Sequence, residues 1–207
     1  MVRKTKEEKE NTRLQILQAA LDCFYEKGFS KTSFDDIATR IGMTKGAVYW
    51  HFKDKGDLLV ELIKQRLEIK AKNSRGNNPS PANLQELRDF FAFEANYLET
   101  HPALQKFIFF TMLQVEWSDA IFNKVLSELG DIRKFHVTTV YNALLSAQKN
   151  GEISPTIDIK ETAQIIANMW KGAIHFYVSE RNADFSIAKN FINGLDIILN
   201  WLKKEGK

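Results

Sequence analysis

The sequence predicts an all-helical protein of about nine helices, with an N-terminal three-helix domain of the helix-turn-helix kind followed by a C-terminal helical bundle. Apolar residues recur at spacings of three and four in almost every segment, and no segment sustains the alternation typical of a strand. Capping residues and glycines bound several of these segments. With 44% hydrophobic and 27% charged residues, the chain has an ordinary globular composition and can form a sizeable core.

The first helix is expected over residues 6–27, where an apolar stripe at helical spacing ends at Gly28, a residue suited to a helix C-terminus. The stripe consists of Leu14, Leu17, Ala20, Leu21 and Phe24. Residues 1–75 carry 16 basic and 11 acidic side chains, a net charge of +5, whereas residues 76–207 have a net charge of −2. This asymmetry suggests a polyanion partner for the N-terminal part, although a solvated surface has the same composition.

Two short helices follow, joined by a tight turn. Ser33 and Asp36 form an acidic variant of the capping box before the first, which ends at Gly42, a residue that tolerates positive φ. Thr44 is a good N-cap for the second, over residues 45–51. Residues 33–52 therefore predict a helix-turn-helix, whose second helix enters the major groove of double-stranded DNA.

The second short helix has the side chains that reading a groove requires. Lys45 can donate to guanine, the methyl group of Ala47 can contact thymine, and Gly46 permits a close approach of the backbone. Ser33 and Thr44 lie at helix N-termini, where hydroxyls, amides and the helix dipole favour a phosphate. These five residues are candidates for DNA contact.

Residues 28–55, GFSKTSFDDIATRIGMTKGAVYWHFKDK, resemble the DNA-binding domain of the TetR family. The run GAVYWHFKDK is especially similar to the multidrug-efflux repressors of the AcrR and TtgR type. The close match covers about residues 1–65, and the rest of the chain matches only in the number, length and placement of helices. The resemblance implies that Tyr49, His51 and Lys55 grip the DNA backbone.

Three aromatic positions in this region allow other interpretations. Trp50 and Phe52 are expected in the core rather than in contact with DNA. His51 could be a metal ligand, but no second ligand stands at a suitable spacing within the motif, so no metal site is predicted. No cofactor is expected.

The domain organisation follows from composition and capping. We expect a DNA-binding domain over residues 1–54, a connecting helix capped by Asp54 over 55–72, a linker of turn formers over 73–81, and a second domain over 82–207. Helices of the second domain are predicted at 82–100, 102–117, 119–149, 159–179 and 186–204.

Aromatic residues crowd the segment from 90 to 135, which is typical either of a core without a cavity or of the walls of an apolar ligand site. Three polar residues, at positions 94, 114 and 136, have apolar neighbours on the same helix face. The resemblance favours a ligand site, because members of the family bind inducers in this domain. The candidates for a small apolar or amphipathic ligand are Phe90, Glu94, Tyr97, Phe110, Gln114, Trp117 and His136.

The last two predicted helices, 159–179 and 186–204, are apolar around most of their circumference, so each is expected to be buried on two sides. This pattern fits the two-helix homodimer interface that the resemblance implies, or else a buried helix of a monomer. A dimer presents two reading helices and calls for a palindromic operator.

Composition also limits the function. One cysteine excludes an internal disulfide and a cysteine-built metal site and fits a reducing, cytoplasmic compartment. The start of the chain has no apolar signal region, and the most apolar uncharged stretch, 107–115, is far short of the ~20 residues of a membrane span. We therefore expect no membrane association.

The resemblance implies a transcriptional repressor that a ligand releases from DNA. The alternatives are a regulator without a small-molecule effector, a regulator of lipid metabolism rather than efflux, and a helical enzyme using Glu94 and His136 as acid and base. The sequence has none of the common catalytic motifs, so no catalytic residue and no enzymatic activity is predicted.

Overall fold

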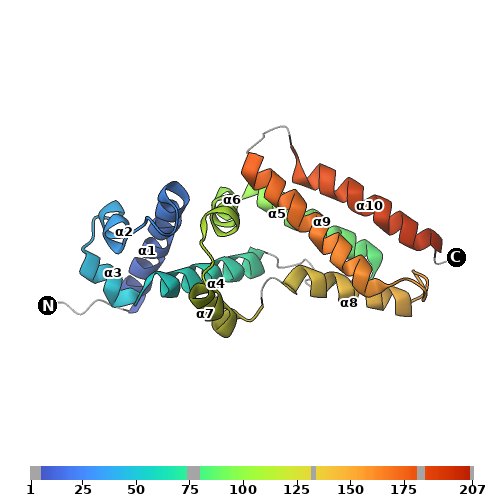
Figure 1. The fold of residues 1–207 in the computed structure, drawn as a ribbon, viewed down its shortest axis with the longest axis horizontal. Helices are drawn as coiled ribbons and strands as arrows, with labels where there is room; N and C mark the ends of the chain where they lie inside the picture. Colours follow the sequence, from blue (N-terminus) through green and yellow to red (C-terminus); the bar gives the residue numbers. More distant parts are fainter. Residues whose placement is uncertain (1–5, 74–79, 132–133, 181–184, 206–207) are drawn as a thin grey trace. The chain divides into compact units, whose positions relative to one another are not determined.

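The computed structural model describes residues 6–73, 80–131, 134–180 and 185–205 (Figure 1). These residues form ten α-helices and one π-helical turn and contain no strand, so the all-helical prediction is confirmed. The elements are α1 (Lys6–Lys27), α2 (Phe34–Arg40), α3 (Lys45–His51), α4 (Lys55–Asn73), α5 (Leu84–Thr100), α6 (Pro102–Phe109), η1 (Phe110–Gln114), α7 (Asp119–Leu129), α8 (Phe135–Lys149), α9 (Ile159–Glu180) and α10 (Ile187–Glu205).

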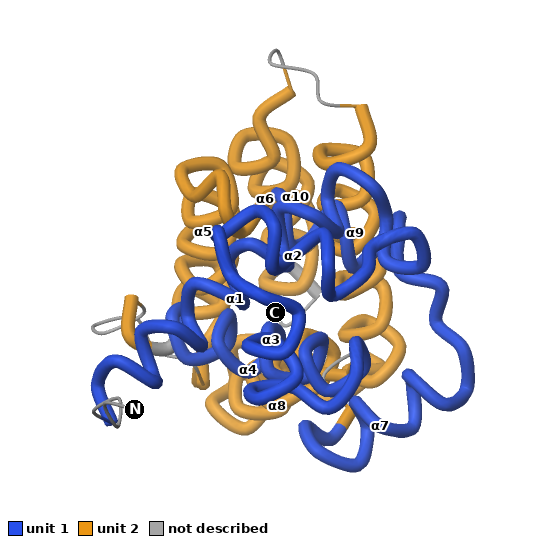
Figure 2. Tube along the Cα trace, turned by 90° about the vertical axis from the view of Figure 1, so that its left-hand side faces the viewer, with its two compact units in different colours: residues 1–70, 106–130 blue, residues 71–105, 131–207 orange. Residues whose placement is uncertain are grey.

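The chain folds into two compact units that are not consecutive in sequence (Figure 2). Unit 1 comprises residues 1–70 and 106–130, and unit 2 comprises residues 71–105 and 131–207. Two of the three boundaries fall inside α4 and α6, so each of these helices contributes to both units, and the third follows α7. This division describes packing; the domain ranges expected from the sequence divide the chain by function and stay predictions. Most of the expected linker, residues 74–79, lies outside the described residues.

The core of unit 1 is built on α1, whose apolar stripe packs against α2 and η1. Phe24 is fully buried and stacks on Phe110, with ring centroids 4.9 Å apart. Leu17, Ala20 and Leu21 are fully buried as expected, but Leu14 is 41% exposed, so its place in the stripe was wrong. It lies at the edge of the helix face that the rest of the unit covers.

Unit 2 is a bundle in which α8 packs on α9, and α10 packs on both α5 and α9. Its centre is aromatic: Phe91 lies 5.3 Å from Trp170 and 5.0 Å from Phe191, measured between ring centroids. At the edge of the bundle the guanidinium of Arg88 on α5 holds the carboxylate of Asp196 on α10 through two hydrogen bonds of 2.6 and 2.9 Å. This pairing fixes the relative position of the two helices.

Two predicted helices are wrong in extent. The continuous helix expected over 119–149 is two helices, because α7 ends at Gly130, which adopts a φ of 69° that favours glycine. The helix expected to reach residue 117 leaves α-geometry at Phe110 and continues as one π turn to Gln114. There the side-chain Nε2 of Gln114 donates to the carbonyl of Tyr25, which ties the segment to α1.

Candidate nucleic-acid interface

The start of α2 is fixed by reciprocal hydrogen bonds. The amide of Asp36 donates to Ser33 Oγ at 3.2 Å, and the amide of Ser33 donates to Asp36 Oδ2 at 2.8 Å, which is the expected capping box. Lys27, the last residue of α1, forms an ion pair with the same carboxylate. The ion pair with Lys27, followed by the bonds from Ser33, holds the pKa of Asp36 far below its ordinary value.

The turn between α2 and α3 requires a residue with positive φ, and Gly42 adopts a φ of 64°. Two amides in the turn, those of Ile41 and Met43, donate to the carbonyl of Ala38. Thr44 then caps α3, because its Oγ1 accepts a 3.3 Å hydrogen bond from the amide of Ala47. The local sequence therefore sets the angle at which α3 leaves the turn.

One face of α3 is buried and the opposite face is open to solvent. Val48 and Phe52 are buried and anchor the helix, so the prediction for Phe52 is confirmed. Trp50 is 61% exposed, and its assignment to the core was wrong; the ammonium of Lys9 lies 5.0 Å from its ring. Tyr49 is 54% exposed, but its ring packs edge-on against Phe34 at 4.8 Å. The phenol group is thus both positioned and accessible.

The other candidates surround this open face. Ser33, Thr44, Lys45 and Gly46 are exposed, whereas Ala47, His51 and Lys55 are partly buried. A Cβ added to Gly46 would meet only Thr44 Oγ1, at 3.8 Å. Packing within the protein therefore does not require a glycine at this position.

Lys45 is paired in the structure, which its sequence position did not reveal. Its ammonium lies 2.8 Å from Asp35 Oδ2, and the hydrogen bond with Asp35 raises the pKa of Lys45. Both side chains are about half exposed or more, so solvent screens the pair and its contribution to stability is small. A base or phosphate can therefore replace Asp35 at small cost.

Lys55 is also engaged. Its ammonium donates to the carbonyl oxygens of Phe29 and Ser30, at 2.8 and 3.0 Å, and lies 4.9 Å from the ring of Phe29. These contacts hold the loop that leads from α1 to α2. Burial lowers the pKa of Lys55, although the carboxylate of Glu116 acts in the opposite direction. Its role at the DNA backbone stays a prediction.

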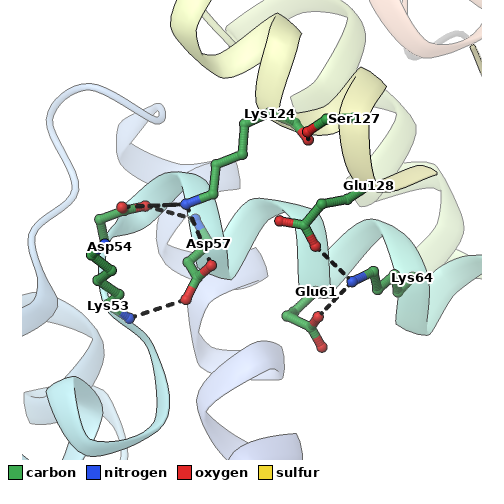
Figure 3. A network of polar contacts seen from close by, with 8 residues as sticks. All are labelled: Lys53, Asp54, Asp57, Glu61, Lys64, Lys124, Ser127 and Glu128. Atoms are coloured by element: carbon green, nitrogen blue, oxygen red, sulfur yellow. Dashed lines mark hydrogen bonds and ion pairs between the residues drawn. The ribbon is translucent and has the colours of Figure 1, made fainter. Parts of the chain in front are cut away.

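An ionic network attaches α7 to the start of α4 within unit 1 (Figure 3). Lys124 of α7 lies 3.0 Å from Asp54 and 3.3 Å from Asp57, and Lys64 of α4 lies 2.8 Å from Glu128. Burial raises the pKa of Asp54, but the amide of Asp57 and the ammonium of Lys124 outweigh it and leave the pKa below its ordinary value. The network joins residues 119–129 to the helix that follows the helix-turn-helix.

The seven ligand candidates lie in two different units. Phe90, Glu94, Tyr97 and His136 belong to unit 2, and the other three belong to unit 1. Glu94 is 8% exposed, and its Oε2 lies 3.7 Å from Nε2 of His136. The same ring nitrogen accepts a 3.2 Å hydrogen bond from the indole of Trp170, a partner that the sequence did not suggest. Because an indole N–H only donates, a neutral His136 carries its proton on Nδ1.

The three candidates in unit 1 have separate surroundings. Phe110 is fully buried against Phe24, and Gln114 donates to the carbonyl of Tyr25. Trp117 is 40% exposed and donates from its indole to the carbonyl of Thr111. A single ligand site made of all seven residues stays a prediction.

The described residues contain neither a metal-binding cluster nor a membrane-spanning helix. Among the residues described, no group of three or more His, Cys, Asp or Glu side chains is arranged to hold a metal ion. Over the same part of the chain, no helix has both the length and the apolar character needed to cross a membrane.

The fold and this face define the chain as a two-unit helical protein with a helix-turn-helix, and comparison with known proteins agrees. Residues 16–62 match the family model "Bacterial regulatory proteins, tetR family". The transcriptional regulator TtgR of Pseudomonas putida is 49% identical over 63 residues, 30% of this chain and 30% of TtgR, so this alignment spans less than a third of that relative. A probable acrEF/envCD operon repressor of Escherichia coli is 28% identical over 181 residues, 84% of this chain and 79% of that protein.

The solved structure of SmeT, described as the repressor of a Stenotrophomonas maltophilia multidrug efflux pump, matches with a TM-score of 0.70 and 25% identity, covering 91% of this chain and 89% of SmeT. The chain therefore carries a tetR-family domain over residues 16–62. Its relatives are named as regulators and repressors, which agrees with the prediction that the protein is not an enzyme.

Proposed function

We propose that this protein is a cytoplasmic transcriptional repressor that binds a palindromic operator as a homodimer and is released from it by a small, largely apolar ligand. The observation that carries the proposal is the open face of α3. Lys45, Gly46 and Tyr49 are exposed there on a helix whose start and opposite face are both held by the protein. A rigid helix with an accessible polar face is what major-groove reading requires.

The proposed contacts divide into two kinds. Lys45 and Ala47 contact base edges and set the sequence preference, while Gly46 lets the backbone approach. Ser33, Thr44, Tyr49, His51 and Lys55 contact phosphates and set register and affinity. Lys55 contacts a phosphate either with its third N–H or after giving up its hydrogen bond to the carbonyl of Phe29 or of Ser30.

Dimerisation is supported by apolar side chains left exposed on α9 and α10. Ile165 and Phe176 of α9 are 53% and 46% exposed, and Ile197 and Trp201 of α10 are 72% and 49% exposed. The opposite faces of the same helices are buried within unit 2 by residues such as Trp170 and Leu195. Exposed apolar side chains that recur on neighbouring helices mark an interaction surface, and a second copy of this chain would cover it.

Ligand release is supported by the chemistry of unit 2. Glu94 and His136 are polar groups set among the rings of Phe90, Phe91 and Trp170. A few polar groups in an aromatic surrounding suit an apolar or amphipathic ligand. Structures of the same fold have been solved for SmeT with triclosan, a largely apolar molecule, and for a FadR of Bacillus subtilis with stearoyl-CoA, an amphipathic molecule with a long apolar acyl chain.

A ligand acts on DNA affinity only through its preference for one conformation of the dimer. We propose that it moves α4, which contributes to both units, and so changes the distance between the two reading helices. Couplings of about 1–3 kcal/mol are typical and would weaken operator binding about 5- to 150-fold. Control of efflux is the first candidate, because SmeT is described as the repressor of an efflux pump. Control of lipid metabolism is the second, because a FadR of Bacillus halodurans, described as a fatty acid degradation regulator, shares the fold.

Selection of bound fragments from random duplexes tests the proposal. We expect a palindrome whose half-sites lie about one helical turn, 34–36 Å, apart or a multiple of it, with a dimer in sedimentation at the same concentration. The double variant Lys45→Ala, Tyr49→Ala serves as the control and should recover no site. Failure of the unmodified protein to enrich any sequence at low salt would refute DNA binding.

The ligand part is tested separately. Thermal unfolding with a set of drug-like and fatty-acyl compounds should reveal at least one that raises the melting temperature and weakens binding to the recovered operator. A protein that binds its operator but responds to none of these compounds would be a regulator without a small-molecule effector.

A further inference from the structure

A surface hollow of about 470 Å³ lies entirely within unit 1. Three segments form it: the loop after α1, the first residue of α4, and the residues around the start of α7. Its lining consists of Phe29, Ser30, Lys55, Glu116, Trp117, Ser118 and Ile121. The volume falls in the range of small-molecule sites, about 300–1,000 Å³. The hollow combines one candidate for DNA contact, Lys55, with one ligand candidate, Trp117.

The charged group on its wall is incompletely satisfied. An ammonium has three N–H donors, and among the described residues that of Lys55 has two hydrogen-bond acceptors, the carbonyls of Phe29 and Ser30. Burial disfavours the charged form and lowers the pKa of Lys55. A ligand anion would supply both an acceptor for the third N–H and the opposite charge that this partly desolvated ammonium favours.

The apolar part of the remaining wall consists of Phe29, Trp117 and Ile121, beside the polar residues Ser30, Glu116 and Ser118. The ring of Phe29 is buried beneath the ammonium. The indole of Trp117 is tethered through its N–H to Thr111 and yet is 40% exposed, so its ring is accessible without being free to turn. Ile121, in the first turn of α7, adds an aliphatic surface. The accessible indole of Trp117 and the branched chain of Ile121 suit a flat aromatic body.

Acidic groups around the hollow determine how strongly it favours an anion. Glu116 is an exposed carboxylate of the lining and opposes an anion at long range. Asp54 and Asp57, next to Lys55 in sequence, are both paired with Lys124. The N-terminus of α7, capped by Ser118, adds the positive end of a helix dipole. Glu116 is therefore the lining residue whose removal should strengthen binding of an anion.

We propose that this hollow binds a small aromatic carboxylate, with the carboxylate on the ammonium of Lys55 and the ring against Trp117 and Ile121. The site is distinct from the cluster around Glu94 in unit 2. The proposal does not depend on DNA binding, because affinity for a small aromatic carboxylate is measured in the absence of DNA.

Isothermal titration calorimetry on the full chain, with 1-naphthoate and 1-naphthylmethylammonium as probes, tests the proposal. The two probes have the same ring system and opposite charges. We expect naphthoate to bind at least tenfold more tightly. Equal binding, tighter binding of the ammonium, or no binding of naphthoate would overturn the proposal.

Variants locate the site. Lys55→Met should abolish the preference for naphthoate, and Glu116→Gln should strengthen naphthoate binding about 2- to 5-fold by removing a like charge. Glu161→Gln, an exposed acid on α9 in unit 2, is the matched control and should change nothing. Lys55 also holds the loop after α1, so Lys55→Met could fail to fold. In that case the effect of Glu116→Gln on naphthoate binding tests the proposal by itself.

Two further variants alter the walls. Trp117→Ala should weaken naphthoate binding several-fold, and Ile121→Trp should fill the hollow and reduce binding at least tenfold while circular dichroism stays unchanged. Unchanged naphthoate affinity in Trp117→Ala would place the bound molecule elsewhere and overturn the assignment of this hollow.

Discussion

Among single residues, Gly46 is one whose substitution should affect DNA binding without lowering stability. Apart from the adjacent residues and the backbone of the same helix, the described atom nearest to a Cβ added there is Thr44 Oγ1, at 3.8 Å, and alanine is a better helix former than glycine. Gly46→Ala should therefore leave stability equal or raise it by up to ~1 kcal/mol, and it should weaken operator binding about tenfold or more by holding the backbone away from the groove. Urea unfolding and a DNA titration measure the two effects; unchanged affinity would contradict the role given to Gly46.

Lys45 depends on its neighbour Asp35. Asp35→Asn removes a carboxylate from the proposed DNA face and frees the ammonium, so operator affinity should rise about 2- to 5-fold at low salt with the same base preference. Lys45→Ala should weaken binding to the preferred operator by about 1–3 kcal/mol and relax the base preference at one base pair. Binding to a panel of single-site operator variants measures both. Unaltered selectivity in Lys45→Ala would show that Lys45 is not the base reader.

Tyr49 combines a packed ring with an accessible hydroxyl. Tyr49→Phe keeps the edge contact with Phe34, so the free energy of unfolding should not change. Loss of one phosphate contact should weaken binding by about 1 kcal/mol to all sequences alike. Tyr49→Ala, which also removes the ring, serves as the comparison and should lower stability as well. A sequence-dependent loss in Tyr49→Phe would instead assign the hydroxyl to a base.

At the scale of helices, the stabilisation from the ionic contacts between α7 and the start of α4 is expected to depend on pH. The pKa of Asp54 in the folded protein lies below its ordinary value of 3.8, so folding favours the ionised carboxylate. The stabilisation is complete above the ordinary value and is lost as the pH falls towards the lowered one. Lys124→Met should therefore cost up to ~1 kcal/mol at pH 7 and progressively less below pH 4.

Urea unfolding at pH 7, 5 and 3.5 measures this difference. Lys160→Met, an exposed lysine on α9, is the matched control and should have little effect at any of the three values. A cost for Lys124→Met that stays constant from pH 7 to 3.5 would mean that its aliphatic chain, not its charge, holds α7.

On the scale of the whole molecule, the exposed apolar face of α9 and α10 predicts assembly. Ile197 is 72% exposed, so Ile197→Glu should leave the fold of one chain intact and place a charge inside the proposed interface. Sedimentation should then detect a monomer, and operator affinity should fall by more than tenfold because one reading helix remains. Asn142→Glu, exposed on α8, is the control and should stay dimeric. A dimer in Ile197→Glu would exclude this face.

Short-range patterns were sufficient for the helix-turn-helix. The capping box of Ser33, the N-cap of Thr44 and the positive φ of Gly42 involve groups three or fewer residues apart, and each is present as predicted. Trp50 was misassigned because an aromatic side chain at a helical spacing does not reveal which face of a helix has a neighbour. Within α3 only Val48 is fully covered by neighbours, and Phe52, the C-cap residue, is buried directly after it.

The sequence by itself determined the helical class, most helix limits and the helix-turn-helix, because capping, glycine stops and apolar periodicity act within one or two turns of the chain. Only the tertiary structure decided that residues 106–130 pack with the N-terminal unit, that Asp35 pairs with Lys45, and that Lys55 and Trp117 share a hollow. Each of these joins groups that packing brings together from separate elements or distant stretches of chain. Local periodicity carries no information about such distances.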